Sequence, residues 1–137
     1  MSEGNGKGSI MVVDDERSLR DVISRALRKK GFDVVTAASG LEALDKASLV
    51  DFDLMFLDIR MPGMSGLEVL ARMAEEHPTT IVVMLTAVSG FNARYEAAQH
   101  EAFAYLPKPC DLAEVTEMAE RLLSGHKEEQ HTVAASV

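Results

Sequence analysis

Short apolar runs alternate along this chain with longer segments in which apolar residues recur every three or four positions. The short runs predict buried strands, because they are bounded by glycine, proline or polar clusters; they cover residues 9–13, 32–36, 54–57, 80–85 and 103–106. The longer segments predict helices. The first closes at Gly31 and the second opens at Ser39, while the others cover residues 65–77, 91–99 and about 111–123.

Each predicted helix carries one apolar stripe that we expect to face the core. These stripes comprise Leu19, Val22, Ile23, Ala26 and Leu27 in the first helix, Leu41, Leu44 and Ala47 in the second, Leu67, Leu70, Ala71 and Ala74 in the third, and Leu112, Val115, Met118, Ala119 and Leu122 in the last. Ser65 and Glu68 form a capping-box pattern at the start of the third helix. The stripe of segment 91–99 is thin and mostly alanine, so we expect this helix to be the most mobile element.

Five strands that alternate with five helices over short connections predict an α/β domain whose parallel sheet is covered on both faces. The strand order 2-1-3-4-5 is the most economical, because right-handed crossovers from a central first strand then cover both faces. The predicted fold is therefore a flavodoxin-like (βα)5 doubly wound sheet. We expect this domain to span residues 9–124, after a flexible leader (1–8) and before a tail or linker remnant (125–137).

Composition narrows the classes of function. The net charge of −8 argues against direct binding to nucleic acid, which needs a basic face. No apolar run approaches the roughly 18 residues of a membrane span, and the first eight residues lack the apolar core of a signal peptide. The single cysteine, Cys110, excludes an internal disulfide and a cysteine-based zinc site. We therefore expect a cytoplasmic protein without a membrane segment.

Polar residues stand at the carboxyl ends of four predicted strands. Asp14 and Asp15 follow the first strand, Asp58 ends the third, Thr86 follows the fourth and Lys108 the fifth. In the order 2-1-3-4-5 the first and third strands are neighbours at the point where ligands bind in such sheets. The three aspartates should therefore converge, and their mutual repulsion favours a hard divalent cation with oxygen ligands, Mg²⁺.

A hydroxyl and an ammonium beside such a cation are suitable partners for phosphoryl oxygens. Three carboxylates, Mg²⁺ and Lys108 sum to about zero charge, and an acyl phosphate on Asp58 would add about one negative charge. Each residue alone has an ordinary explanation: Asp14 and Asp15 as helix caps, Asp58 as a turn residue, Thr86 as a β-former and Lys108 as a solvated lysine. Their joint placement at one edge of the sheet favours a phosphate-handling site.

Four motifs resemble the receiver domain of bacterial two-component response regulators. They are Val12-Val13-Asp14-Asp15-Glu16, the segment from Leu57 through Asp58 to Gly66, Leu85-Thr86-Ala87, and Tyr105-Leu106-Pro107-Lys108-Pro109. The resemblance covers about residues 9–123, with the motifs in the order and spacing of that family.

The resemblance implies that Asp58 accepts a phosphoryl group from a sensor histidine kinase or a phosphotransfer protein. Asp15, Asp58 and the backbone carbonyl of Arg60 would ligate Mg²⁺, with Asp14 acting largely through water. Lys108 and Thr86 would contact the phosphoryl group, and Tyr105 would be an aromatic switch that turns inward when Thr86 moves. The family also has a cis peptide before Pro109.

The resemblance further implies a signalling phosphoacceptor rather than a conventional enzyme, with modest self-catalysed phosphoryl transfer and autodephosphorylation. Its output would be a shift between two packings of the fourth helix, fifth strand and fifth helix, read by a downstream protein or by an output domain. Homodimers through that face are common in the family.

Two residues on the expected signalling face depart from the family pattern, because Glu101 replaces a common glycine and Cys110 a common phenylalanine. Arg60 lies beside the expected path of the attacking water, so it should affect the lifetime of the phosphoryl group. Two other classes of protein are alternatives. A haloacid dehalogenase-like phosphatase would need a D-x-D pair, whereas Asp14 and Asp15 are adjacent. A receiver that binds partners without phosphate would not need the intact acidic site.

Overall fold

The computed structural model describes residues 6–86 and 102–128, with side chains to Ser124. The strands are β1 (Ser9–Val13), β2 (Asp33–Ala37), β3 (Leu54–Asp58), β4 (Ile81–Thr86) and β5 (Ala104–Pro107). The helices are α1 (Arg17–Lys29), α2 (Gly40–Leu49), α3 (Gly66–Glu76) and α5 (Leu112–Glu128). The predicted helix at 91–99 and Glu101 lie outside the described residues.

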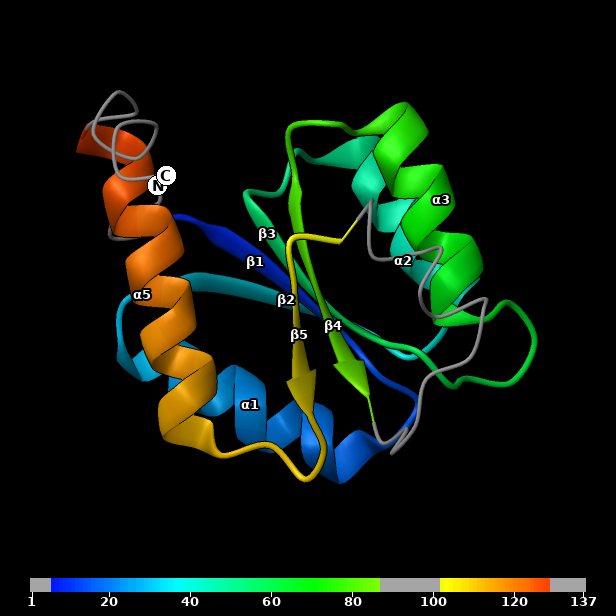
Figure 1. Cartoon of the computed structure of the whole chain (residues 1–137), viewed down its shortest axis with the longest axis horizontal. Coiled ribbons are helices and arrows are strands. Elements are labelled where there is room, and N and C mark those ends of the chain that lie inside the picture. The colour runs from blue at the N-terminus through cyan, green and yellow to red at the C-terminus, as the bar shows by residue number, and fades with distance from the viewer. Residues whose placement is uncertain (1–5, 87–101, 129–137) are drawn as a thin grey trace.

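All five strands are parallel and lie in the order β2-β1-β3-β4-β5, which confirms the predicted topology. Helices α1 and α5 cover one face of the sheet and α2 and α3 the other (Figure 1). Residues Ile10 to Val13 of β1 and Leu54 to Leu57 of β3 are completely buried. These near-continuous apolar strands are what a sheet covered on both faces requires.

Local sequence signals account for the helix ends. The Ser65 side chain accepts a hydrogen bond from the backbone N–H of Glu68, and the Glu68 carboxylate accepts one from Ser65, so the predicted capping box is present. Ser39 caps α2 in the same way through the N–H of Glu42. Gly31 follows α1 with φ +100°, a conformation that favours glycine over residues with a Cβ.

Several details of the predicted helices are wrong. Leu41 is 63% exposed, and Val22 and Ala71 are exposed as well, so these residues do not face the core. Leu44, Ala47 and Leu70 are buried as predicted, and Ala43, Val69 and Met73 are buried beside them. The last helix continues to Glu128, past the end expected near Leu123.

None of the helices formed by residues 6–86 and 102–128 is long and apolar enough to cross a membrane.

Candidate functional site

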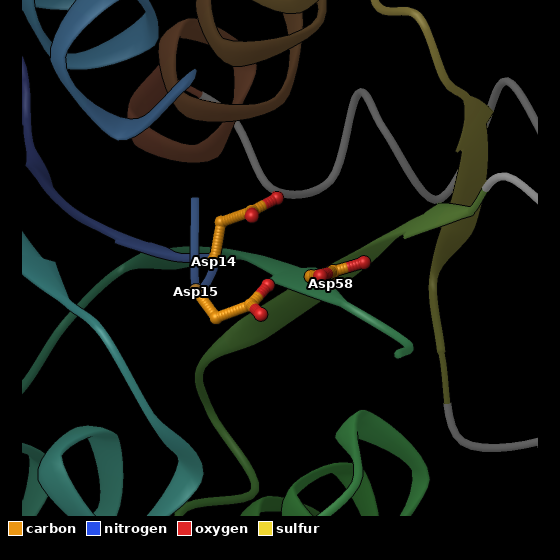
Figure 2. A group of neighbouring side chains, drawn as sticks. All are labelled: Asp14, Asp15 and Asp58. Atoms are coloured by element: carbon orange, nitrogen blue, oxygen red, sulfur yellow. The ribbon is translucent and has the colours of Figure 1, made fainter. Parts of the chain in front are cut away.

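The three predicted aspartates meet at the carboxyl edge of the sheet. Val13, the last residue of β1, pairs in register with Leu57, so Asp14 leaves the sheet beside Asp58. One carboxylate oxygen from each of Asp14, Asp15 and Asp58 lies within 4.8 Å of the other two. Figure 2 shows the three side chains projecting to the same side of this edge. The predicted convergence is therefore confirmed.

Asp14 is completely buried, and all of its polar groups are engaged. Its N–H donates to the carbonyl of Ala37 at the end of β2 (3.2 Å), and its carbonyl accepts from the Arg20 guanidinium (2.9 Å). One carboxylate oxygen accepts from the N–H of Glu16 (2.9 Å) and the other from Lys108 (3.0 Å). Asp14 therefore does not act as a simple helix cap, because Glu16 occupies the cap position of α1 without a side-chain capping bond.

Asp58 is also buried, with 3% of its surface exposed. Its Oδ1 lies 3.4 Å from both the Lys108 ammonium and the backbone nitrogen of Arg60. Burial, and then the charge of Asp14, raise the pKa of Asp58 from 3.8 to about 6, although Lys108 acts in the opposite direction. The folded protein therefore disfavours the negative charge on Asp58, and a cation at this edge would favour it.

Lys108 is not a solvated surface lysine. Its side chain is 18% exposed, and its ammonium forms ion pairs with Asp14 and Asp58. Burial by itself lowers the pKa of Lys108, but the hydrogen bond to Asp14 and the charge of Asp58 raise it overall, so the side chain stays cationic. The Lys108 N–H donates to the carbonyl of Thr86 (2.8 Å), which fixes the loop after β5 against the end of β4. The Lys108–Pro109 peptide is cis, as the resemblance implied.

The remaining predicted residues occupy the places expected from their strands. Thr86 is buried at the end of β4, where it pairs in register with Pro107. Tyr105 is half-buried and packs against the core cluster between the sheet and helices α2 and α3. Arg60 has an exposed side chain in the loop after Asp58.

Two contacts of the site were missed by sequence reasoning. Gly66 begins α3 directly against the end of β3, where an added Cβ would overlap the Asp58 carbonyl oxygen and lie 2.7 Å from the Cα of Ile59. Glycine after the Ser65 cap was a signal that could have indicated this close approach. The contact between Arg20 and Asp14 joins residues six positions apart, and no periodic pattern marks it.

The donor set fits Mg²⁺. It consists of carboxylate oxygens only, from three aspartates of which Asp14 and Asp58 are buried. Burial, and then the charge of Asp14, raise the pKa of Asp58, so its anionic form lacks full compensation in the folded protein. Hard divalent cations prefer such ligands and neutralise such charge.

Comparisons with known proteins agree with this arrangement. Residues 10–120 match the response regulator receiver domain family. The chain is similar to the DNA-binding transcriptional regulator NtrC of Escherichia coli, with 40% identity over 124 residues, or 90% of this chain and 26% of NtrC. It is similar to sporulation initiation phosphotransferase F of Bacillus subtilis, with 32% identity over 83% of this chain and 92% of that protein.

A solved structure similar to this fold is the response regulator protein TrrA from Thermotoga maritima in complex with Mg²⁺-BeF. It has a TM-score of 0.77 and 34% sequence identity, over 85% of this chain and 99% of that one. By contrast, the chain spans only about a quarter of the length of its NtrC relatives.

Proposed function

The chain belongs to the response regulator receiver domain family, and we propose that Asp58 is its phosphoacceptor. The observation that carries this proposal is the convergence of three aspartates and Lys108 at the carboxyl edge of the sheet. Asp58 is the aspartate that ends a strand, and burial, followed by the charge of Asp14, raises its pKa to about 6, the kind of perturbation that is common at functional sites.

We propose the metal ligands that the family resemblance implied. Asp15, Asp58 and the carbonyl of Arg60 would hold Mg²⁺, whereas Asp14 would act largely through water because Lys108 and Glu16 already engage its carboxylate. The chemistry that Mg²⁺ supplies when bound is positive charge close to the phosphoryl oxygens.

In the proposed reaction, an oxygen of the Asp58 carboxylate attacks the phosphorus of a phosphohistidine or a small phosphodonor. The new bond is the acyl P–O bond, and the bond between phosphorus and the donor nitrogen or oxygen breaks, with its electron pair leaving on the donor. Lys108 is placed to neutralise charge on the transferred group, because its ammonium lies 3.4 Å from Asp58. Attack by water on the phosphorus later restores Asp58 and releases inorganic phosphate.

The switch follows from the charge that the reaction adds. Phosphorylation replaces one negative charge on Asp58 by about two. The hydroxyl of Thr86 and the ammonium of Lys108 are the proposed partners for the added charge. Movement of Thr86 would make room for Tyr105 to turn inward, and this would change the face that includes β5 and α5.

The partners of the chain are also proposals. We propose a sensor histidine kinase or phosphotransfer protein as the donor and a downstream protein or output domain as the receiver of the signal. A homodimer through the face of the fourth helix, β5 and α5 is a further expectation, as is a cytoplasmic location. We take residues 9–124 as the receiver unit and assign it a signalling role, with only self-catalysed phosphoryl transfer and autodephosphorylation.

Intact-mass measurement tests the proposed reaction. The chain is incubated with acetyl phosphate and Mg²⁺, beside an EDTA control and the Asp58→Asn variant. We expect an adduct of about 80 Da that needs both Mg²⁺ and Asp58. No adduct, in protein shown to bind Mg²⁺, would refute the phosphoacceptor function and favour partner binding without phosphate.

A further inference from the structure

Arg20 binds a backbone oxygen of the acidic site and none of its carboxylates. It lies in the first turns of α1, is half-buried, and donates from Nη1 to the carbonyl oxygen of Asp14 at 2.9 Å. We propose that Arg20 is a positioning residue that holds the Asp14–Asp15 loop in its metal-binding shape. This inference rests on the proposed Mg²⁺ site.

The contact acts on Asp15 through the geometry of the peptide bond. The carbonyl that Arg20 binds belongs to the peptide that joins Asp14 to Asp15. Because a peptide unit is planar, fixing its oxygen also fixes the plane from which the backbone of Asp15 continues. The Asp15 side chain is exposed, and no hydrogen bond within residues 6–86 and 102–128 holds its carboxylate in place. Its direction toward Asp58 therefore depends on the orientation of this peptide.

The other side of the loop is already fixed. The N–H of Asp14 is bound to Ala37 of β2, and its carboxylate is bound by Glu16 and Lys108. The N–H of Glu16 holds the peptide that follows Asp15, and Arg20 supplies the restraint on the peptide that precedes it. Without this restraint, the peptide between the two aspartates could rotate while Asp14 itself stayed in place.

Arg20 also interacts electrostatically with a second acidic residue, Glu42. Glu42 lies in the first turn of α2. Its pKa is lowered first by the hydrogen bond from the N–H of Ala38, then by Lys46, and to a smaller extent by the charge of Arg20. Glu42 is itself held by Ala38 and Lys46 at 2.8 Å each, so Arg20 has a fixed anionic neighbour.

Arg28 offers a matched control on the same helix. Its guanidinium donates to the carbonyl of Val34 in β2 at 3.0 Å, which is the same kind of bond between α1 and a backbone oxygen. Val34 lies inside β2, and its carbonyl belongs to no residue of the acidic site. Loss of either arginine should therefore cost similar stability, whereas only loss of Arg20 should disturb Asp15.

Isothermal titration of the metal-free chain with Mg²⁺ tests the proposal on the wild type, Arg20→Ala, Arg20→Lys and Arg28→Ala. Because the lost hydrogen bond restrains the backbone and does not touch the metal, only part of its free energy should reach Mg²⁺ binding, and we expect the Kd for Mg²⁺ to rise roughly three- to tenfold in Arg20→Ala. Arg28→Ala should stay within about twofold of the wild type, and Arg20→Lys should recover part of the affinity.

The outcomes separate this inference from the proposed function. If the wild type does not bind Mg²⁺, the proposed metal site is wrong and the role of Arg20 is lost with it. If the wild type binds Mg²⁺ and Arg20→Ala binds it equally well, the metal site stands and the inference is wrong. Equal weakening by Arg28→Ala would also overturn it, because the effect would then be general destabilisation. Arg20→Gln replaces Arg20→Ala in the same series if the alanine variant does not fold.

Discussion

Replacing Asp58 by asparagine should stabilise the metal-free protein, although it destroys the proposed phosphoacceptor. The asparagine side chain has the shape of a protonated aspartate and carries no charge. In the folded protein the negative charge of Asp58 is disfavoured by burial and by Asp14, which raise its pKa from 3.8 to about 6. Removing that charge should therefore relieve a cost that the folded state bears at neutral pH.

The size of the effect follows from linkage between ionisation and folding. The unfolded chain ionises Asp58 near pH 3.8, whereas the folded protein does so only near pH 6. Below pH 3.8 Asp58 is protonated in both states, and its ionisation does not affect folding. The free energy of unfolding falls as the pH rises from 3.8 to about 6, and it stays lower above pH 6. A shift of about two pKa units corresponds to about 3 kcal/mol at most, so we expect Asp58→Asn to gain about 2–3 kcal/mol at neutral pH.

Urea unfolding in EDTA measures this gain at about pH 8 and at about pH 4.5, where most of the difference should disappear. Asp51→Asn, at an exposed carboxylate before β3, is the control and should change the free energy of unfolding by less than about 0.5 kcal/mol. Added Mg²⁺ should narrow the gap, because it should bind the wild type more tightly than the variant. A wild type as stable as Asp58→Asn at about pH 8, or a gap that does not depend on pH, would refute the reasoning.

Three further substitutions test separate parts of the site. Gly66→Ala should cost about 1–3 kcal/mol and slow phosphorylation, since its Cβ would press on the Asp58 backbone. Urea unfolding measures the first effect and intact mass the second, and a variant as stable as the wild type would contradict the predicted overlap. Lys108→Ala should slow phosphorylation at saturating Mg²⁺ by about tenfold or more, and a normal rate would exclude a role for the ammonium in the transfer. Arg60→Ala should change the rate of dephosphorylation but keep the backbone contact to Asp58. An unchanged phosphoryl lifetime would show that the Arg60 side chain does not affect the attack of water.

The sheet and the meeting of the aspartates could be predicted from the sequence because both depend on strand order. Once β1 and β3 are neighbours, the residues that follow them share one edge, whatever the details of the helices. The roles assigned to Asp58, Thr86 and Tyr105 remain predictions, because they concern a reaction rather than a position.

The missed features depend on packing that periodicity does not describe. In α2 the sequence predicts Leu41 on the inward stripe, but Gly40 lies close to Val69 and Met64, and the buried positions of the helix are Gly40, Ala43, Leu44 and Ala47. The sequence predicts that the last helix ends near Leu123, ahead of Gly125, yet a single glycine inside a helix costs only about 1 kcal/mol and α5 continues to Glu128.

The most direct test of the central claim is to locate the phosphoryl group on the chain. After reaction with acetyl phosphate and Mg²⁺, borohydride reduction converts an aspartyl phosphate to homoserine, and fragment mass spectrometry then identifies the residue. The account predicts homoserine at position 58, and none when Mg²⁺ is removed by EDTA. Homoserine at Asp14 or Asp15, or unmodified Asp58 in protein that has gained the phosphoryl mass, would contradict it.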